Sequence, residues 1–414
     1  METRLPDSLR ATSDGKVAEA ILRACVHCGF CNATCPTYQL LGDELDGPRG
    51  RIYQIKQVLE GAPATRTTQL HLDRCLTCRN CETTCPSGVE YGHLVDIGRA
   101  AVEKQVRRPF KERALHALLR AALTRRGLFG AAMRIGRAVR FALPQSLRNK
   151  LQPVRPEGSW PRRTHARQVL LLRGCTQPAM LPSIDAATAR VLDAIGIQVL
   201  IASEAGCCGA IRQHLTDHAG ALANMRRNID AWWPHLAHGN VESIVINASG
   251  CAVTVKEYGH LLRDDPAYAH KALRVSQVAC DLSELLLPEL ATLRSHLAAA
   301  STQRVAVQIP CTLQHGQKLS GKLESLLQGL GLQLPAVAES HLCCGSAGTY
   351  SLLQPSLATS LRDRKLANLL QSQAQIILSA NIGCISHLQT GTAVPVWHWI
   401  EWLDQALKSA TSYA

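Results

Sequence analysis

The chain has 414 residues, of which 46% are hydrophobic, and a formal net charge of +13. This length and composition indicate a soluble globular protein of two to four domains. The opening residues METRLPDSLRATSDGK lack the basic-then-apolar order of a secretory signal, and no run approaches the roughly 18 to 20 apolar residues of a membrane span. We therefore expect a cytoplasmic protein that is neither secreted nor membrane-spanning.

Two cysteine motifs dominate the first region, residues 1–103. They are CVHCGFCNATCP at 25–36 and CLTCRNCETTCP at 75–86, and both follow C-x2-C-x2-C-x3-C-P. In paired motifs of this spacing, three cysteines bind one [4Fe-4S] cluster and the fourth binds the other cluster. We assign to the first cluster Cys25, Cys28, Cys31 and Cys85, and to the second cluster Cys75, Cys78, Cys81 and Cys35. Two clusters close together predict one-electron transfer.

Zinc is the alternative for four thiolates, but zinc sites usually carry two CxxC pairs separated by a long loop. Three cysteines at successive i+3 positions, occurring twice, favour iron-sulfur clusters. Disulfides are not expected among the 17 cysteines, because the cytoplasm is reducing. The nearby His27, His71 and His93 are interpreted as polar neighbours or surface residues rather than ligands.

The basic charge is concentrated between Lys104 and Arg167, where 17 Lys or Arg residues stand against two acids. Apolar residues recur there at helical spacing, and Gly127 and Gly130 are expected to divide the segment into two helices. An amphipathic helix with a cationic face suits an anionic membrane surface or a partner subunit. A connector packed on the following domains is the alternative. Nucleic acid is not expected as a partner, because no aromatic stacking series accompanies the cations.

An internal repeat organises residues 168–414. Cys175 is followed after 31 residues by the Cys-Cys-Gly motif at 207–209, and Cys311 is followed after 31 residues by the same motif at 343–345. Each half has one further cysteine, Cys251 in the first and Cys384 in the second. Buried strands are predicted at 168–175, 198–203, 243–249, 304–311 and 375–381, and helices at 183–195 and 356–370.

The cysteines of the repeat fall just after predicted strand ends, where open α/β sheets place ligands. Packing as small buried side chains is the alternative for them. The predicted fold class is therefore multidomain, α+β and α/β. It comprises an N-terminal helical, ferredoxin-like two-cluster domain (1–103), a basic amphipathic connector (104–167) and two repeated α/β domains with Cys-Cys-Gly motifs (168–290 and 300–414).

Three segments besides the cysteine motifs are characteristic of one protein family. They are DGPRGRI at 46–52, SGCAVTVKEYG at 249–259 and IPCTLQH at 309–315. With them the chain resembles, over nearly its whole length, the iron-sulfur subunit of bacterial glycolate oxidase (glycolate dehydrogenase). Electron-transfer subunits of anaerobic glycerol-3-phosphate dehydrogenase and heterodisulfide reductases have related architectures.

The resemblance implies an electron-transfer subunit. A separate FAD-containing subunit would oxidise glycolate or another 2-hydroxy acid, and this chain would pass electrons singly to a membrane acceptor such as a quinone, at the inner face of the cell membrane. The sequence carries no convincing dinucleotide fingerprint, so the flavin is expected on the partner. Two alternatives are considered. The chain could be the electron-transfer subunit of a lactate or glycerol-3-phosphate dehydrogenase, or it could be a redox-sensing or structural iron-sulfur protein.

Relatives among heterodisulfide reductases carry a fifth cysteine in each repeat and can bind a non-cubane cluster. Thr254 and His387 stand at those fifth positions here. Four cysteines remain per half, namely Cys175, Cys207, Cys208 and Cys251, then Cys311, Cys343, Cys344 and Cys384. Whether these repeats hold a further iron-sulfur or metal centre stays open, as does ligation by His387. Cys280 has no counterpart and is interpreted as packing.

Overall fold

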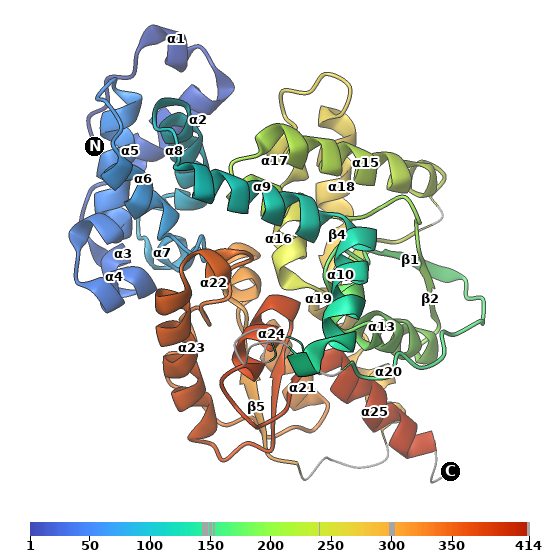
Figure 1. The fold of residues 1–414 in the computed structure, drawn as a ribbon. Helices are drawn as coiled ribbons and strands as arrows, with labels where there is room; N and C mark the ends of the chain where they lie inside the picture. The colour runs from blue at the N-terminus through green and yellow to red at the C-terminus, as the bar shows by residue number, and fades with distance from the viewer. Residues whose placement is uncertain (143–147, 149–150, 152–153, 240, 298–302, 412–414) are drawn as a thin grey trace.

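The computed structural model describes residues 1–142, 148, 151, 154–239, 241–297 and 303–411. A helical N-terminal region, a pair of connecting helices and an α/β region with two parallel sheets follow one another along the chain (Figure 1). The predicted fold class, a mixture of helical and α/β domains, is confirmed.

Short helices joined by tight turns build the N-terminal region. They are α1 (Asp7–Arg10), α2 (Ser13–Ala24), α3 (Phe30–Ala33), α4 (Pro36–Leu41), η1 (Glu44–Asp46), α5 (Pro48–Leu59), α6 (Arg66–Asp73), α7 (Asn80–Thr84) and α8 (Tyr91–Gln105). Their core contains the fully buried Leu22, Ile55 and Leu94. Gly98 of α8 lets α5 approach closely, because a Cβ there would lie 2.5 Å from Ile55 Cγ1. This packing holds the two cysteine loops at one end of α5 and α8.

The basic segment forms α9 (Phe110–Thr124), α10 (Arg126–Ala138) and the turn η2 (Arg140–Ala142). Two helices were expected, but the predicted break at Gly127 and Gly130 is wrong, because the chain turns at Arg125 (φ −101°, ψ 98°) and both glycines lie inside α10. A single glycine costs a helix only about 1 kcal/mol. Figure 1 shows α9 crossing from the N-terminal region to the first α/β half.

The first α/β half contains a four-stranded parallel sheet in the order β2-β1-β3-β4. Its strands are β1 (Arg167–Leu171), β2 (Ile197–Leu200), β3 (Ile244–Ile246) and β4 (Ala279–Asp281). Its helices are α12 (Gln177–Met180), α13 (Ser183–Ala194), α14 (Ala210–His214), α15 (His218–Ala237), α16 (Ser249–Lys256), α17 (Tyr258–Leu261), α18 (Ala269–Val278), α19 (Leu282–Leu286) and α20 (Leu290–Ser295). The predicted strands β1 to β3 are present but shorter, and β4 was not predicted.

The second half has a three-stranded parallel sheet, β5-β6-β7. Its elements are β5 (Val305–Gln308), η3 (Thr312–Gly316), α21 (Lys322–Gly329), α22 (Tyr350–Leu353), α23 (Pro355–Leu370), β6 (Ile376–Ser379), α24 (Ile382–Gln389), β7 (Val396–His398) and α25 (Trp399–Thr411). Within the described residues, this half has no strand that corresponds to β2. Pro335 lies in the equivalent segment and has no backbone N–H to donate to a sheet.

The two halves share one hydrophobic core, which runs from Val169 and Ile184 of the first half to Val305 and Leu378 of the second. The last helix, α25, packs on α13 of the first half, where Arg190 forms a bidentate ion pair with Asp404 at 2.7 and 2.8 Å. None of the helices in the described ranges is both long enough and apolar enough to cross a bilayer.

Candidate metal centres

The two cysteine loops follow the same backbone path. His27 and Gly29 have φ values of 61° and 86°, and Thr77 and Arg79, at the equivalent positions, have 53° and 59°. These left-handed residues turn the chain between successive cysteines, so that the first three thiols of each motif line one cavity. A short helix and the fourth cysteine follow in both motifs.

Each cavity is completed by the fourth cysteine of the other motif. The first is lined by Cys25, Cys28, Cys31 and Cys85, and the second by Cys75, Cys78, Cys81 and Cys35. Cys81 also borders the first cavity, so the two cavities share a wall. Cys28 is exposed, whereas Cys78 and Cys81 are buried. The structure therefore brings together both predicted sets, and four soft thiol donors around one space suit a [4Fe-4S] cluster.

The protonation of these thiols also fits a metal centre. Burial, followed by repulsion from Cys25, raises the pKa of Cys31 to about 11. Burial likewise raises the pKa values of Cys78 and Cys81 well above the usual value. Bare thiolates would be costly in such surroundings, because a buried charge needs a partner. These cysteines would hold a cationic metal centre as thiolates, and its charge would supply the partner that burial requires.

Polar contacts tie the two loops to each other. Thr34 Oγ1 and Thr84 Oγ1, at equivalent places in the two motifs, are 3.0 Å apart. The buried Asn80 donates from Nδ2 to the backbone oxygen of Thr34 at 2.9 Å. The loops therefore form one unit and fix the separation of the two cavities.

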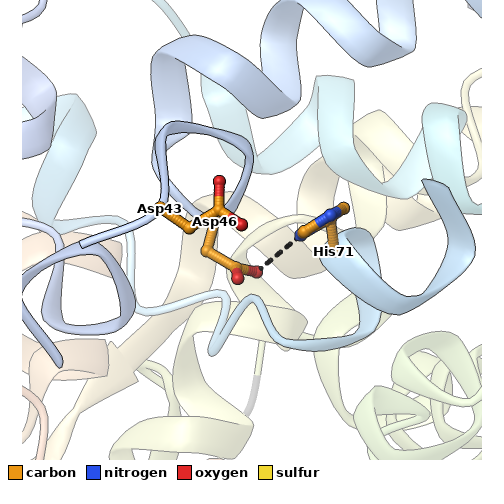
Figure 2. A group of neighbouring side chains, drawn as sticks. All are labelled: Asp43, Asp46 and His71. Atoms are coloured by element: carbon orange, nitrogen blue, oxygen red, sulfur yellow. Dashed lines mark ion pairs between the residues drawn. The ribbon is translucent and has the colours of Figure 1, made fainter. Parts of the chain in front are cut away.

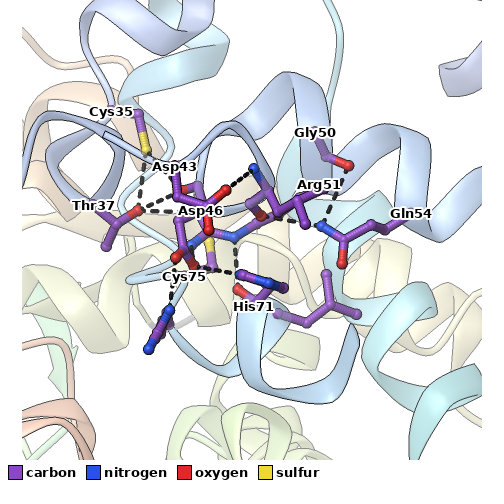
Figure 3. Close-up of polar contacts among 12 residues, drawn as sticks. Cys35, Thr37, Asp43, Asp46, Gly50, Arg51, Gln54, His71 and Cys75 are labelled. Carbon is purple, nitrogen blue, oxygen red and sulfur yellow. Dashed lines mark hydrogen bonds and ion pairs between the residues drawn. The ribbon is translucent and has the colours of Figure 1, made fainter. Parts of the chain in front are cut away.

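A buried charged network lies against the second cavity (Figure 3). Arg51 of α5 is only 1% exposed, and its guanidinium donates to Thr37 Oγ1 (3.1 Å), to the backbone oxygen of His71 (2.7 Å) and to Asp46 Oδ1 (3.3 Å). Thr37 Oγ1 lies 3.3 Å from Cys35 Sγ. A single hydroxyl thus joins the Arg51 charge to a thiol of the second set.

Asp43, Asp46 and His71 come close together at this network (Figure 2), with one polar atom from each within 4.8 Å of the others. Asp46 is fully buried, and Arg74 Nη1 pairs with its Oδ2 at 2.8 Å while His71 Nδ1 lies 3.1 Å from its Oδ1. Because Arg51 and Arg74 already neutralise this carboxylate, the group is an ion-pair network and not a cation site.

No role was predicted for Asp46 and Arg51, although both lie in the segment DGPRGRI. One signal could have identified Arg51. It shares a helical face with Ile55 and Val58, at i, i+4 and i+7, and a charge within an apolar stripe requires a buried partner.

Four cysteines also converge in each α/β half, and all but the half-buried Cys251 are buried. The thiols of each half lie close enough to shift one another's pKa. Cys207, together with burial, raises the pKa of Cys175, and Cys343, together with burial, raises the pKa of Cys311. The pKa of Cys208 is shifted by Cys207 and Cys251, and that of Cys344 by Cys343 and Cys384. In the second half, Cys311 Sγ and Cys343 Sγ are 3.7 Å apart. Both predicted sets are therefore assembled by the fold.

The glycine of each Cys-Cys-Gly motif is required by the backbone. Gly209 and Gly345 have φ values of 99° and 87°. A Cβ at Gly345 would lie 2.4 Å from the backbone oxygen of Ala358, and one at Gly209 would lie 3.1 Å from that of Ala221. Only glycine lets the chain turn here while α15, in the first half, or α23, in the second, stays close.

The remaining candidate positions make other contacts. Thr254 Oγ1 donates to the backbone oxygen of Gly250 at 3.2 Å, and His387 Nε2 lies 3.0 Å from that of Ala358. Cys280 is half-buried in β4 and its Sγ lies 3.3 Å from the backbone oxygen of Asp281. Among the three histidines near the motifs, His27 is exposed, His71 contacts Asp46 and His93 contacts Glu257.

The second cysteine cavity adjoins the second α/β half. Cys78 packs in one apolar cluster with Cys311, Cys343 and Tyr350. Tyr350 donates its hydroxyl to the backbone oxygen of Arg74 at 3.1 Å, and Thr83 Oγ1 lies 2.9 Å from His315 Nδ1. The cysteines of the second cavity and those of the second repeat are therefore neighbours in one buried region.

A charged contact holds the same loop to the first half. Arg79 Nη2 donates to Glu257 Oε2 at 2.8 Å, and His93 Nε2 lies 3.3 Å from Glu257 Oε1. Burial opposes ionisation of Glu257, but His93 and Arg79 lower its pKa to about 2. The carboxylate is thus ionised at neutral pH and fixes the loop between both α/β halves.

Comparison with known proteins defines the class. The 4Fe-4S dicluster domain family matches residues 21–89, and the cysteine-rich domain family matches residues 169–256 and 305–389. The chain is an iron-sulfur protein in which a dicluster domain precedes two cysteine-rich domains.

The glycolate oxidase iron-sulfur subunit of Escherichia coli (strain K12) is 53% identical over 410 residues, which cover 99% of this chain and 100% of that protein. The probable glycolate oxidase iron-sulfur subunit of Bacillus subtilis (strain 168) is 30% identical over 405 residues, 91% of this chain and 90% of that protein. Lactate utilization protein A of an Exiguobacterium strain is 26% identical over 259 residues, 58% of this chain. The chain belongs to the family of glycolate oxidase iron-sulfur subunits.

Proposed function

We propose that this chain is the electron-transfer subunit of a glycolate oxidase complex and that a partner flavoprotein carrying FAD oxidises the substrate. The observation that carries the proposal is the pair of adjoining four-thiol cavities, which suit redox centres, in a member of this family. Iron-sulfur clusters accept and release single electrons, which is the chemistry that links a flavin to a distant acceptor.

The proposed ligands follow the cavities. Cys25, Cys28, Cys31 and Cys85 would hold one [4Fe-4S] cluster, and Cys75, Cys78, Cys81 and Cys35 the other. The surroundings of the two proposed clusters differ. The exposed Cys28 places the first set near the surface. In the second set all but the half-buried Cys75 are buried, and Arg51 and Arg79 line the same cavity, where their positive charges would favour the reduced state of a bound centre.

An additional iron-sulfur or metal centre is proposed for the second repeat, at Cys311, Cys343, Cys344 and Cys384. Its support is the burial of all four thiols and the packing of Cys311 and Cys343 against Cys78. Iron analysis of protein purified without oxygen tests this point. Two clusters alone predict about eight irons per chain, and Cys344→Ser would leave that number unchanged. A higher iron content that falls to about eight in Cys344→Ser would support the third centre.

The basic connector is proposed to hold the complex at an anionic membrane surface, where a quinone would be the acceptor. Its helices α9 and α10 expose Phe110, Leu118, Ile135 and, just beyond, Phe141 among the cations of this segment. We expect the protein to sediment with phosphatidylglycerol vesicles and not with phosphatidylcholine vesicles. Ile135→Asp should weaken this binding, whereas Leu273→Asp, at an exposed leucine of α18, should not. Equal binding of both variants would refute a docking role for α10.

Complementation tests the function as a whole. A purified flavoprotein subunit should reduce decylubiquinone with glycolate only when this chain is added, and the Cys78→Ser variant should not restore turnover. Lactate and glycerol 3-phosphate, tested with the same partner, identify the substrate. Quinone reduction by the flavoprotein alone, at the rate of the complex, would overturn the proposal.

A further inference from the structure

A cavity of about 240 Å³ lies beside the second cysteine set, outside the thiol sites themselves. Its walls come from α6, α8, α9, α14 and α22, so it is enclosed by the N-terminal region, the basic connector and both α/β halves. Small-molecule sites typically occupy about 300 to 1,000 Å³. This space therefore suits a single-ring head group rather than a complete lipid.

The cavity touches the loop that carries the second set of thiols. Cys75, Leu76 and Thr77 line it directly. Arg99 fixes this loop, because its guanidinium donates to Thr77 Oγ1 at 3.0 Å and to the backbone oxygens of Cys75 and Leu72, both at 2.8 Å. A molecule bound in the cavity would thus lie in contact with Cys75, a proposed cluster ligand.

The lining combines apolar walls with two available histidines. The apolar walls include Leu70, Leu115, Leu215 and Leu353. The arginines that line the cavity are already engaged: Arg66 contacts Gln69 and Glu112, Arg99 holds the loop, and Arg108 pairs with Asp73 at 2.6 and 2.9 Å. Hydrogen-bond capacity toward a ligand must therefore come from other groups.

His116 of α9 is buried, with 8% of its surface exposed, whereas His214 of α14 lines the same cavity at its exposed side. Within the described part of the chain, neither ring makes a hydrogen bond to a protein group. Burial, followed by the charge of Arg108, lowers the pKa of His116 to about 4, so this ring is neutral at pH 7 and offers one N–H donor. A neutral donor favours an uncharged acceptor such as a carbonyl oxygen.

The position of α9 links the cavity to the connector. Leu115 and His116 face the cavity, while Phe110 and Leu118 of the same helix are exposed. One helix thus forms a wall of the cavity and part of the apolar surface proposed to meet lipid. A lipophilic ligand at the membrane surface would reach the cavity along α9.

We propose that this cavity binds the ring of a quinone, with its carbonyl oxygens accepting hydrogen bonds from His116 and His214. The inference rests on the proposed function, which supplies electrons from a 2-hydroxy acid. One quinone takes up two electrons, delivered singly from the reduced iron-sulfur protein, and two protons from solvent, and leaves as the quinol. The oxidised iron-sulfur protein is then ready for the next substrate.

Re-oxidation of the iron-loaded protein tests the site without glycolate or the flavoprotein. The protein is reduced with dithionite, freed of excess reductant and mixed with decylubiquinone, and the return of iron-sulfur absorbance is followed in a stopped-flow instrument. His116→Phe should slow the reaction by about tenfold, the effect of losing one buried hydrogen bond. Leu115→Trp, which fills the cavity, should slow it at least as much.

Ala117→Trp, at an exposed position of α9 that does not line the cavity, is the matched control and should react like the unaltered protein. Ferricyanide, a small ionic oxidant that needs no apolar pocket, should re-oxidise all variants equally, which shows that their clusters are intact. Photolabelling with an azidoquinone should mark the peptide containing residues 110–124.

Equal decylubiquinone rates in all variants, or labelling confined to another surface, would overturn the proposed site while leaving the electron-transfer function standing. Conversely, if glycolate with the flavoprotein does not reduce the protein but decylubiquinone re-oxidises it with the expected variant pattern, the proposed function fails and the quinone site remains. The two failures are therefore distinguishable.

Discussion

Arg51→Met removes the guanidinium buried against the second cysteine cavity while retaining a long, unbranched side chain in α5. The substitution breaks the contact with Asp46 and leaves Thr37 Oγ1 and the backbone oxygen of His71 without their donor. Because these groups are buried, water does not replace the lost partner. We therefore expect a large loss of stability at a position far from the protein surface.

The magnitude follows from burial. Removing one member of a buried ion pair costs about 3 to 5 kcal/mol. Arg74 stays within 2.8 Å of Asp46, so the loss should lie near the lower end, about 3 kcal/mol. Arg49→Met is the matched control in the same helix. The Arg49 side chain is 36% exposed and pairs with Glu44 at 2.6 Å, an interaction that contributes about 0 to 1 kcal/mol.

Urea unfolding of the iron-loaded protein under anaerobic conditions measures the difference, with far-UV circular dichroism as the probe of folding. Arg51→Lys, which retains the charge, should lose less stability than Arg51→Met. A redox titration followed by electron paramagnetic resonance (EPR) adds a second readout, because loss of a positive charge should lower the potential of the second cluster. Equal stability of Arg51→Met and Arg49→Met, or an unchanged potential, would refute the assigned role.

Further predictions concern the thiols, the tight turns and a buried histidine. Cys28→Ser and Cys78→Ser should each lose one cluster, about four irons, and abolish coupled turnover; full iron content in either would contradict the ligand assignment. Gly345→Ala should destabilise the protein more than Gly209→Ala in thermal melts, because its Cβ would meet a backbone oxygen at 2.4 Å instead of 3.1 Å. Burial lowers the pKa of His398 to about 4, so between pH 6.5 and 4 the unfolded chain binds a proton that the folded chain does not. The free energy of unfolding should therefore fall as the pH falls through that range, by about 2 kcal/mol at pH 5. His398→Asn should remove this part of the pH dependence. An unchanged pH profile in that variant would contradict the role given to His398.

The first three thiols of each cluster set were predictable because their spacing is local, and the fourth, from the other motif, was predictable because paired motifs of this spacing exchange their last cysteine. Three cysteines at successive i+3 positions specify a loop, and the repeated spacing after Cys175 and Cys311 specifies two similar α/β halves. The strands after which the cysteines fall are apolar and bounded by turn residues, so they too were found. Strands β4 and β7 were missed because, unlike the equally short but wholly apolar β3, each ends in a polar residue, Asp281 or His398, and forms no continuous apolar run.

Long-range features were not predictable from the sequence. The contact of Cys78 with Cys311 and Cys343 joins residues more than two hundred positions apart and depends on how the N-terminal region docks. The network of Arg51 and Asp46 likewise depends on which face of α5 is buried. The break at Arg125, rather than at the nearby glycines, reflects packing of α10 on α12, which overrides the weak helix preference of glycine.

EPR of the reconstituted complex shows whether this chain accepts electrons from the flavoprotein. The iron-loaded chain is mixed with its flavoprotein partner and glycolate without oxygen or quinone, and the spectrum is recorded after rapid freezing. Electron transfer from the flavoprotein predicts signals of reduced [4Fe-4S] clusters that disappear when decylubiquinone is added. Clusters that remain oxidised while the flavin of the partner is reduced would show that this chain does not accept electrons from the flavoprotein.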